Sequence, residues 1–500
     1  MTAEAVESRK AELMIPQDEL KKVVAETEKS VEEVKKMDDS KTQKVQKSSS
    51  YREESNFLSD LKEFEKKALN ELKAKLEEAI LGNNLFKKEE SKKNEKEKPV
   101  VEEEEKDNET KKGEESEKTG EEEAGKIEEE KSAGQENENA AKESEQEKPS
   151  IKVDEDICIW GVPLLPSKEA EATDVVLLKF LRAREFKVND AFEMLKKTLQ
   201  WRKDANIDSI LDEDLGSDLS SVAYMNGVDL EGHPVCYNFF GVFEDEKLYT
   251  KTFGTEEKRS QFLRWRFQLM EKGIKELDMR PGGVTSLLQI TDLKNSPGIS
   301  KKDLRVSMKQ VVGVLQDNYP EFVARNIFVN APFWYHALNA LLSPFLTQRT
   351  KSKFVVARPA KVTETLLKYI SAEEIPVQYG GFKKENDLEF SKANDPVSEL
   401  TIKAGSTETI EIPAAEVGST LIWDLTVLNW EVNYKEEFVP NDEGSYTIIV
   451  QKKKKMGCNE GPIRNTFRNN EPGKIVLTIG NGSNKKKRVL YRYKIKNCLY

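Results

Sequence analysis

Three cations stand between two apolar segments in the stretch Leu341–Val356, which reads LLSPFLTQRTKSKFVV. If this stretch is a strand, Arg349, Lys351 and Lys353 share one face, because side chains alternate along a strand. If it is a helical turn, Thr350 and Lys353 lie side by side, three positions apart. A hydroxyl and an ammonium in that arrangement both donate to a phosphate oxygen. The residues therefore indicate either a phosphate site or a basic face exposed to solvent.

Residue types that carry enzyme chemistry are sparse in this chain. Its two histidines, His233 in the turn-like EGHPV and His336 in a helix-like segment, are both interpreted as structural. The four cysteines lie far apart and form no CxxC pair, which favours a reducing compartment over a disulfide scaffold or a zinc site. The sequence also lacks HExxH, the Walker phosphate loop and GxSxG. We therefore expect a binding protein with no catalytic residues, no metal and no cofactor other than a bound ligand.

The segment just before the cations, APFWYHALNALLSPFL, carries an apolar stripe at helical spacing. Such a stripe is typical either of an ordinary core helix or of a helix that covers an apolar ligand or contacts lipid. The stripe consists of Phe333, Trp334, Ala337, Leu338, Leu341, Leu342 and Phe345.

Charge is distributed unevenly along the chain. Residues 91–150 hold 22 acids and 12 bases, whereas residues 451–500 hold 14 Lys or Arg and only two acids. Residues 87–150 contain no aromatic residue, so they bury too little apolar area to offset the entropy of ordering. We expect this acidic insert and the polar residues 1–50 to be disordered. The insert is interpreted as a linker, with electrostatic covering of the basic C-terminus as the alternative.

The polar N-terminal region is interrupted by one amphipathic helix within residues 51–86. Its apolar residues recur at three- and four-residue spacing. The sequence predicts that Ser55 or Asn56 caps this helix and that Gly82 ends it. An isolated surface helix is marginal in water, so we expect it to dock on other helices.

The rest of the chain is globular in composition and divides into three parts. Residues 151–215 have two helical patterns. In residues 216–390 strand-like and helix-like runs alternate, which predicts a mostly parallel sheet covered by helices. In residues 396–500 the period changes to two, with Gly and Asn turns, which predicts a β-sandwich. No run of about 18 apolar residues is present, so no membrane-spanning helix is expected.

Several motifs resemble those of a known family. LLKFLRAREFKVNDAFEML, QDNYPEFVARNIFVNAPFWY, SPFLTQRTKSKF and EEIPVQYGG resemble the CRAL-TRIO lipid-binding family, and its yeast-type phosphatidylinositol/phosphatidylcholine transfer branch in particular. EKKALNELKAKLEEAI is similar to that family's first helix. A CRAL-TRIO domain with a long acidic N-terminal region and a C-terminal GOLD-type β-sandwich resembles the plant patellins. The resemblance implies a helical N-terminal lobe, an α/β lipid-binding fold and then an all-β domain.

The resemblance also implies a site. The family holds acyl chains in an apolar cavity closed by a gating helix, here 332–345, and binds the headgroup phosphate inside. Its phosphatidylinositol ligands carry over to Arg184 of LRAR, Glu321 of YPE, and Thr350 and Lys353 of TKSK.

The chain departs from this family pattern on the strand before DLK. The hydroxyl residues that hold phosphatidylcholine in the transfer branch are replaced here by Leu287 and Gln289. This difference argues against phosphatidylcholine binding in that mode.

These observations predict a cytoplasmic, peripherally membrane-associated protein that binds or transfers phosphoinositides. The resemblance to patellins implies a role in membrane trafficking at the plasma membrane or at the plant cell plate during cytokinesis. Two alternatives are a carrier of a non-phosphorylated, tocopherol-like hydrophobe and a membrane-sensing scaffold whose GOLD domain binds a protein partner. No nucleic-acid partner is expected, since no aromatic platform accompanies the lysines.

A basic patch is predicted on the sandwich as the attachment to anionic membrane surfaces. Its cations are expected at strand ends, on one edge. They are Lys452, Lys453, Lys454, Lys455, Lys485, Lys486, Lys487 and Arg488.

Overall fold

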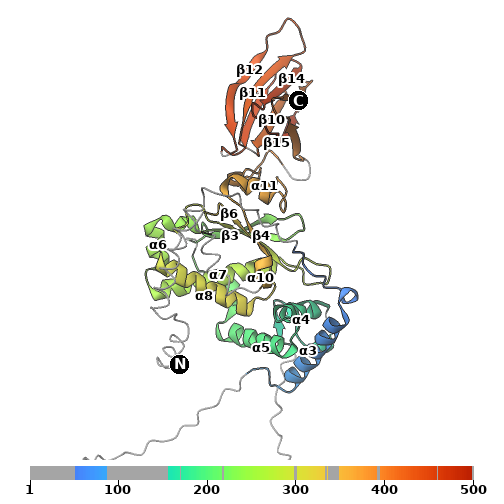
Figure 1. The fold of residues 1–500 in the computed structure, drawn as a ribbon, viewed down its shortest axis with the longest axis vertical. Coiled ribbons are helices and arrows are strands. Elements are labelled where there is room, and N and C mark those ends of the chain that lie inside the picture. The colour runs from blue at the N-terminus through green and yellow to red at the C-terminus, as the bar shows by residue number, and fades with distance from the viewer. Residues whose placement is uncertain are drawn as a thin grey trace, which may run out of the picture.

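The computed structural model describes residues 51–86, 156–168, 171–216, 219–297, 301–332, 335, 348–390, 395–428, 430–458 and 460–497. Figure 1 shows the α/β domain between a helical N-terminal lobe and a C-terminal β-sandwich. The predicted fold class is therefore confirmed. The segments expected to be disordered, 1–50 and 87–150, lie outside the described residues. So do the predicted gating residues Phe333, Trp334, Leu338, Leu341, Leu342 and Phe345.

The N-terminal lobe consists of three helices that pack on one another, α3 (Glu63–Leu81), α4 (Glu171–Ala183) and α5 (Val188–Asp204). The apolar stripe of α3, which includes Leu69, Leu72 and Leu76, is buried in the core that the three helices share. A two-stranded hairpin of β1 (Cys158–Ile159) and β2 (Val162–Pro163) adds Ile159 and Val162 to this core. Docking of the amphipathic helix thus supplies the stability that its own sequence lacks.

The predicted start of this helix is wrong, although its end at Gly82 is correct. The helix begins at Glu63, after Lys62, whose N–H donates to the Glu65 carboxylate at 2.9 Å. Residues 51–57 form neither helix nor strand. The Ser55 hydroxyl donates to Asp60 and the Asn56 amide oxygen accepts from Arg182, both at 2.6 Å, so neither side chain caps α3.

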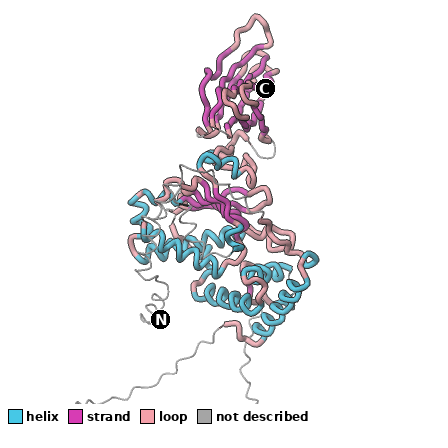
Figure 2. The backbone as a smooth tube through the Cα atoms, viewed as in Figure 1, coloured by secondary structure: helices cyan, strands magenta, loops and turns pink. Residues whose placement is uncertain are grey.

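The α/β domain is built on a five-stranded sheet of order β3-β4-β5-β6-β7, in which only β3 is antiparallel. Figure 2 shows this sheet as the centre of the domain. Its strands are β3 (Ala223–Val228), β4 (Pro234–Phe239), β5 (Leu287–Asp292), β6 (Val323–Val329) and β7 (Phe354–Val356). Its helices are α6 (Glu246–Phe253), α7 (Glu256–Lys275), α8 (Lys302–Asn318), α10 (Gln348–Ser352) and α11 (Val362–Leu366).

The two faces of this sheet are covered by different elements. On one face Val235, Leu288 and Ile327 pack with Val362 and Leu366 of α11. On the other face α7 approaches the sheet closely at Gly273. A Cβ atom at this glycine would lie 3.0 Å from Leu287 of β5, so a side chain here would force helix and strand apart.

The C-terminal domain is a β-sandwich of two four-stranded antiparallel sheets, ordered β13-β10-β15-β8 and β12-β11-β14-β9. Trp423, Tyr434 and Phe438 are fully buried between the sheets. The strands are β8 (Ser398–Ile402), β9 (Thr407–Ala414), β10 (Thr420–Val427), β11 (Glu431–Pro440), β12 (Ile448–Gly457), β13 (Ile463–Arg468), β14 (Gly473–Gly480) and β15 (Lys487–Lys496).

Buried ion pairs join the sandwich to the segment that follows the α/β domain. Asp424 of β10 is fully buried and accepts hydrogen bonds from Arg464 at 2.7 Å and Arg492 at 2.8 Å. Both arginines also reach Asp387, at 2.8 and 3.1 Å, and Arg492 donates to the carbonyl of Phe382. The two domains are therefore held together by a shared charge network rather than by a plain linker.

None of the described helices is both long enough and apolar enough to cross a membrane.

Candidate functional site

Two cations beside the sheet converge on Glu321, in the turn between α8 and β6. Lys353, which precedes β7, donates from Nζ to Glu321 Oε2 and to the carbonyl of Val323, both at 2.8 Å. Arg349 of α10 donates from Nε to Glu321 Oε1 at 2.7 Å. The backbone of Glu321 has φ of 56°, in the left-handed region that non-glycine residues rarely occupy. Such strained positions concentrate at functional sites.

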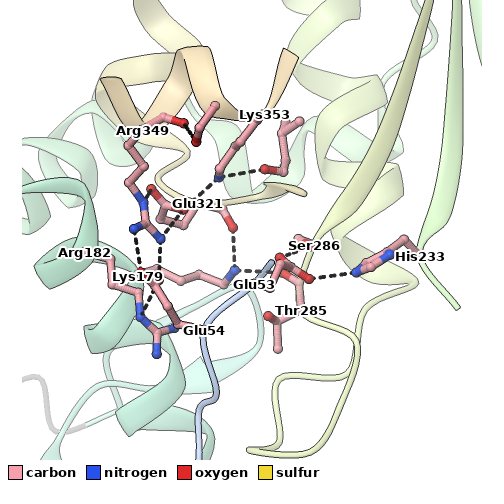
Figure 3. A network of polar contacts seen from close by, with 12 residues as sticks. Glu53, Glu54, Lys179, Arg182, His233, Thr285, Ser286, Glu321, Arg349 and Lys353 are labelled. Atoms are coloured by element: carbon pink, nitrogen blue, oxygen red, sulfur yellow. Dashed lines mark hydrogen bonds and ion pairs between the residues drawn. The ribbon is translucent and has the colours of Figure 1, made fainter. Parts of the chain in front are cut away.

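Helix α4 adds two further cations to the same place (Figure 3). Lys179 is only 3% exposed and donates to the carbonyls of Thr285, at 2.7 Å, and Glu321, at 2.9 Å. Arg182, one helical turn later, is also buried. Burial lowers the pKa of Lys179 to about 7, while nearby Glu53 and Glu321 oppose this shift. These two carboxylates therefore compensate the Lys179 ammonium only in part.

The segment 51–57, which we call the strap, lies across these cations and supplies acceptors to them. Glu54 receives hydrogen bonds from Arg349 Nη1 and Nη2 at 2.7 and 2.5 Å. Its carboxylate also lies 3.3 Å from Arg182 Nε. Arg182 donates in addition to the carbonyl of Ser55 and the amide oxygen of Asn56, both at 2.6 Å.

The second strap carboxylate, Glu53, is held at the edge of the cluster. It accepts from Ser286 at 2.5 Å and contacts His233 Nε2 at 2.7 Å, while His233 Nδ1 lies 2.8 Å from Asp229. Burial opposes the charge of Glu53, but the hydrogen bonds from His233 and Ser286 outweigh it and lower its pKa to about 2. His233, interpreted from sequence as structural, thus positions a strap carboxylate.

The cluster carries an excess of positive charge. Apart from the strap, the cluster has four cations, Lys179, Arg182, Arg349 and Lys353, and the single carboxylate of Glu321, so its formal charge is 4 − 1 = +3. The strap adds Glu53 and Glu54. Three of these cations, Lys179, Arg182 and Lys353, are buried, and buried cations require anionic partners. In this structure the anions that pair with these cations, among them Glu54 and Glu321, belong to the chain itself.

A cavity of about 250 Å³ opens beside the cluster and is lined by the strap, Lys179, Arg182, Glu321 and Arg349. The turn Pro281–Gly283 closes one side of it. A Cβ at Gly282 would lie 3.0 Å from the ring of Phe57, so the lack of a side chain there lets the strap lie close to the turn.

Of the four headgroup residues carried over from the family, Glu321 and Lys353 lie at this site and Thr350 lies on α10 beside it in the chain. Glu321 and Lys353 are in direct contact, and Thr350 lies half-buried on α10, next to Arg349. Arg184 is not brought to the cluster, because it lies just past the end of α4, where its guanidinium donates to the carbonyl of its neighbour Ala183. Arg182 of the same LRAR motif takes that place.

Sequence reasoning missed Lys179, Arg182 and the strap. Lys179 and Arg182 were detectable in principle, since they lie three positions apart within the apolar run VVLLKFLR and are therefore buried on one side of a helix. The strap, YREESNF, has no pattern that distinguishes it from a polar linker.

The positions that replace the family's phosphatidylcholine ligands share the α7 side of the sheet but differ in burial. Leu287 is fully buried in the core shared with the N-terminal lobe. Gln289 is half-buried, on the α7 side of the sheet. From the predicted gating segment only Pro332 and Tyr335 are described, and the Tyr335 ring packs 5.0 Å from that of Phe328.

The predicted basic patch is distributed over both sheets of the sandwich. Lys452–Lys455 lie within the edge strand β12 rather than in a loop beyond it. Lys453 lines a depression of about 210 Å³ together with Asn481 and Gly482, which belong to the turn that leads to Lys485. Lys487 is buried and Arg488 pairs with Glu399 at 2.6 Å, so neither is a free surface cation.

Comparisons with known proteins agree with this architecture. Family models match for the CRAL/TRIO N-terminal domain at residues 68–197, the CRAL/TRIO domain at 219–381 and the Patellin-1-like C-terminal GOLD domain at 403–487. The chain is 56% identical to Patellin-4 of Arabidopsis thaliana over 551 aligned positions, with 99% of each chain covered. It is 49% identical to Patellin-3 of the same plant, over 68% of this chain and 70% of that one.

A more distant relative is the phosphatidylinositol transfer protein SFH5 of Kluyveromyces lactis, which is 29% identical over 52% of this chain and 86% of its own length. The resemblance noted in the sequence is thereby confirmed, since the similarity extends over all three parts of the fold. The chain belongs to the patellin family.

Proposed function

We propose that this protein binds phosphatidylinositol or a phosphoinositide in its CRAL/TRIO domain and transfers it between membranes, or presents it at one, without catalysing a reaction. Membership of the patellin family and the CRAL/TRIO match support lipid binding. A relative named as a phosphatidylinositol transfer protein supports the choice of headgroup.

The observation that carries this proposal is the convergence of four cations on a site that the chain fills with its own carboxylates. A phosphate oxygen accepts the same charge-assisted hydrogen bonds as a carboxylate oxygen. A headgroup phosphate therefore replaces Glu54 on Arg349 and Arg182. Lys353 then donates to the headgroup, and Glu321 accepts from inositol hydroxyls.

The acyl chains supply most of the affinity in this proposal. Burying a methylene is worth about 0.8 kcal/mol, so two chains outweigh any headgroup contact. The cationic cluster then selects which lipid enters. A tocopherol-like ligand has no group that would compensate four cations, and this argues against the uncharged-hydrophobe alternative.

Attachment to membranes is assigned to the sandwich. Lys452, Lys453 and Lys455 are exposed on edge strand β12, and cations near an anionic surface are attracted by about 1 kcal/mol each. A role in membrane trafficking at the plasma membrane or the cell plate, as implied by the resemblance to patellins, is part of this proposal.

The test is lipid uptake by the Lys353→Ala variant. A buried charge-assisted hydrogen bond is worth about 1.5–3 kcal/mol, so phosphatidylinositol affinity should fall about tenfold or more. Uptake is measured by native mass spectrometry after incubation with vesicles of phosphatidylinositol, phosphatidylcholine or tocopherol-doped lipid.

Lys351→Ala is the matched control. Lys351 is also a lysine and lies two residues before Lys353, on α10, whereas the hydrogen bond to Glu321 comes from Lys353. It should leave uptake unchanged. Equal phosphatidylinositol uptake by wild type and Lys353→Ala, or a preference for tocopherol, would contradict the proposal.

A further inference from the structure

The outer face of the sandwich carries a polar depression of about 210 Å³, on the sheet that contains β12, β11 and β14 (Figure 1). Side chains alternate along these strands, so β11 buries Val432 and Tyr434 in the core and turns Asn433 and Lys435 outward. Every second side chain of each strand covers this outer face, so a hollow in it requires a local cause.

Gly480 of β14 is the cause of the depression. It lies in register between Thr407 of β9 and Asn433 of β11. A Cβ atom at Gly480 would lie 3.5 Å from Thr407 Oγ1 and 3.6 Å from Asn433 Cβ, so a larger side chain would fill the space between them. The φ angle of Gly480 is outside the left-handed region, so its backbone does not require glycine. The missing side chain therefore shapes the surface rather than a turn.

Two turns beside Gly480 form a fixed wall of the depression. Asn481 is only 2% exposed and donates from its amide to the carbonyls of Lys403 at 3.0 Å and Lys485 at 2.8 Å. The N–H of Gly405 donates to the carbonyl of Ser483 at 3.2 Å, which ties the same two turns together. A wall that is already ordered costs little entropy when a ligand binds.

The lining of the depression includes polar groups that have no hydrogen-bond partner in the described part of the chain. They are the amide of Asn433, the hydroxyls of Thr407 and Thr478, and the ammonium of Lys453. Amides and hydroxyls both donate and accept hydrogen bonds, which suits the hydroxyls of a ligand. An ammonium suits a phosphate group. The lining therefore fits a molecule that carries both kinds of group.

The charge of the lining favours an anion. Its charged side chains are Lys435 and Lys453, and no carboxylate of the described residues lines the depression. Lys453 is exposed on β12, whereas Lys435 pairs with Glu437 at 2.7 Å. Lys485, exposed in the adjacent turn, adds positive charge nearby. A neutral ligand would leave these cations without a counter-ion, and a metal cation would be repelled.

We propose that this depression binds a phosphorylated polyol of the inositol phosphate class, either as the headgroup of a membrane lipid or as a soluble molecule. Lys453 and Lys435 contact the phosphate, while Asn433 and the two threonines contact ring hydroxyls. Pockets that enclose a drug-sized ligand measure about 300–1,000 Å³, so a depression of about 210 Å³ holds a headgroup but not acyl chains. The lipid form of this ligand rests on the proposed attachment of the sandwich to membranes, and neither form depends on lipid uptake by the CRAL/TRIO domain.

Gly480→Val tests the site without changing any charge, because the valine side chain fills the depression and suits a strand. Binding of inositol trisphosphate to the full chain is measured by isothermal titration, with inorganic phosphate and myo-inositol as comparison probes. Wild type should bind the trisphosphate more tightly than either comparison probe, and Gly480→Val should weaken this binding about tenfold or more. Each variant is also made in the Lys353→Ala background, so that binding at the cluster around Glu321 does not mask the result.

Two lysine variants form a matched pair. Lys453→Ala removes a cation that lines the depression, whereas Lys474→Ala removes one from β14 that pairs with Glu411 outside it. Only Lys453→Ala should lower the affinity for the trisphosphate. Asn433→Ala is a second variant of the lining, and urea unfolding checks that each variant folds. Binding at wild-type strength by both Gly480→Val and Asn433→Ala, or equal losses in the two lysine variants, would overturn the proposal.

Vesicles distinguish the two sources of the ligand. Vesicles that contain phosphatidylinositol bisphosphate are compared with phosphatidylserine vesicles of equal surface charge. If the ligand is a lipid headgroup, Gly480→Val should bind only the bisphosphate vesicles more weakly; if it is soluble, the variant should lose trisphosphate binding alone. Equal weakening on both kinds of vesicle would contradict the proposal. Unchanged phosphatidylinositol uptake by Lys353→Ala would contradict the proposed function and leave this site intact.

Discussion

The first prediction concerns the strap, because it occupies the site that we assign to the headgroup. Glu54→Gln keeps the size of the side chain and removes its charge. Glu54 receives two hydrogen bonds from Arg349 and lies 3.3 Å from Arg182. The hydrogen bonds from Arg349 lower the pKa of Glu54, so the carboxylate is ionised at neutral pH and competes with any incoming phosphate.

The size of the effect follows from the exposure of this ion pair. The Glu54 side chain is 48% exposed and that of Arg349 is 28% exposed. Exposed pairs contribute about 0.2–1 kcal/mol and hydrogen bonds to charged groups about 1.5–3 kcal/mol, so we take about 1–1.5 kcal/mol for a half-exposed pair. This corresponds to about a five- to twelvefold change in an equilibrium constant.

Two quantities should therefore move in opposite directions. The free energy of unfolding of the ligand-free protein should fall by about 1 kcal/mol in Glu54→Gln, since a favourable pair is lost. Affinity for phosphatidylinositol should rise about five- to twelvefold, since the competitor is lost. Binding is measured by titration with vesicles at about 0.05 M salt, and the gain should shrink at about 0.5 M, where surface charges are screened.

Glu63→Gln is the matched control, because it removes one negative charge from an exposed position at the start of α3. It should leave the affinity for phosphatidylinositol unchanged and lower the free energy of unfolding by only about 0.2–0.5 kcal/mol, because its pair with Lys66 is exposed. If Glu54→Gln binds phosphatidylinositol no better than wild type at low salt, the strap does not compete with the headgroup, and the site assignment is refuted.

Three further predictions concern the rest of the molecule. Asp424→Ala should lower the free energy of unfolding by about 3–5 kcal/mol in a urea titration, because it leaves the buried Arg492 and the partly buried Arg464 short of a partner. A loss below about 1 kcal/mol would contradict this role. Charge reversal of Lys452–Lys455 should weaken binding of the full chain to anionic vesicles at low salt and leave binding to neutral vesicles unchanged. If binding to vesicles does not depend on salt, a protein partner becomes the better explanation. Burial opposes the charge of His233, but its two carboxylate partners outweigh this and raise its pKa from 6.5 to about 10. The stabilising effect of protonated His233 should therefore be complete below pH 6.5 and disappear as pH rises towards 10. The difference in unfolding free energy between wild type and His233→Gln should shrink over that pH range. A difference that grows with pH would contradict this prediction.

Much of the fold was predictable because it is encoded locally. The apolar period of about 3.6 residues in α3 and α7 and the period of two in β9 and β14 follow from which face each element buries. The change of period near residue 396 likewise predicted the all-β domain. Glu321 and Lys353 were identified because the motifs that carry them are short and specific.

The antiparallel edge strand β3 and the helix start at Glu63 were not predictable in the same way. β3 carries mostly half-buried residues and no clean alternation, so its place at the sheet edge depends on pairing with β4. The start of α3 depends on what residues 51–57 bind elsewhere, because a polar segment beside a helix extends it only when its groups have no better partners.

What the sequence by itself determined is therefore the order of the domains, most helices and strands, and the cationic chemistry around Lys353. Only the tertiary structure decided which arginine of LRAR reaches the site. Arg182 lies within α4 and Arg184 just past its end, and the way α4 packs on α3 and α5 decides which of the two faces the cluster. The tertiary structure also decided that the strap, more than 100 residues from α4 in the chain, supplies the carboxylates. Partners so distant in sequence leave no local pattern, and only the folded core brings their charges within hydrogen-bonding distance.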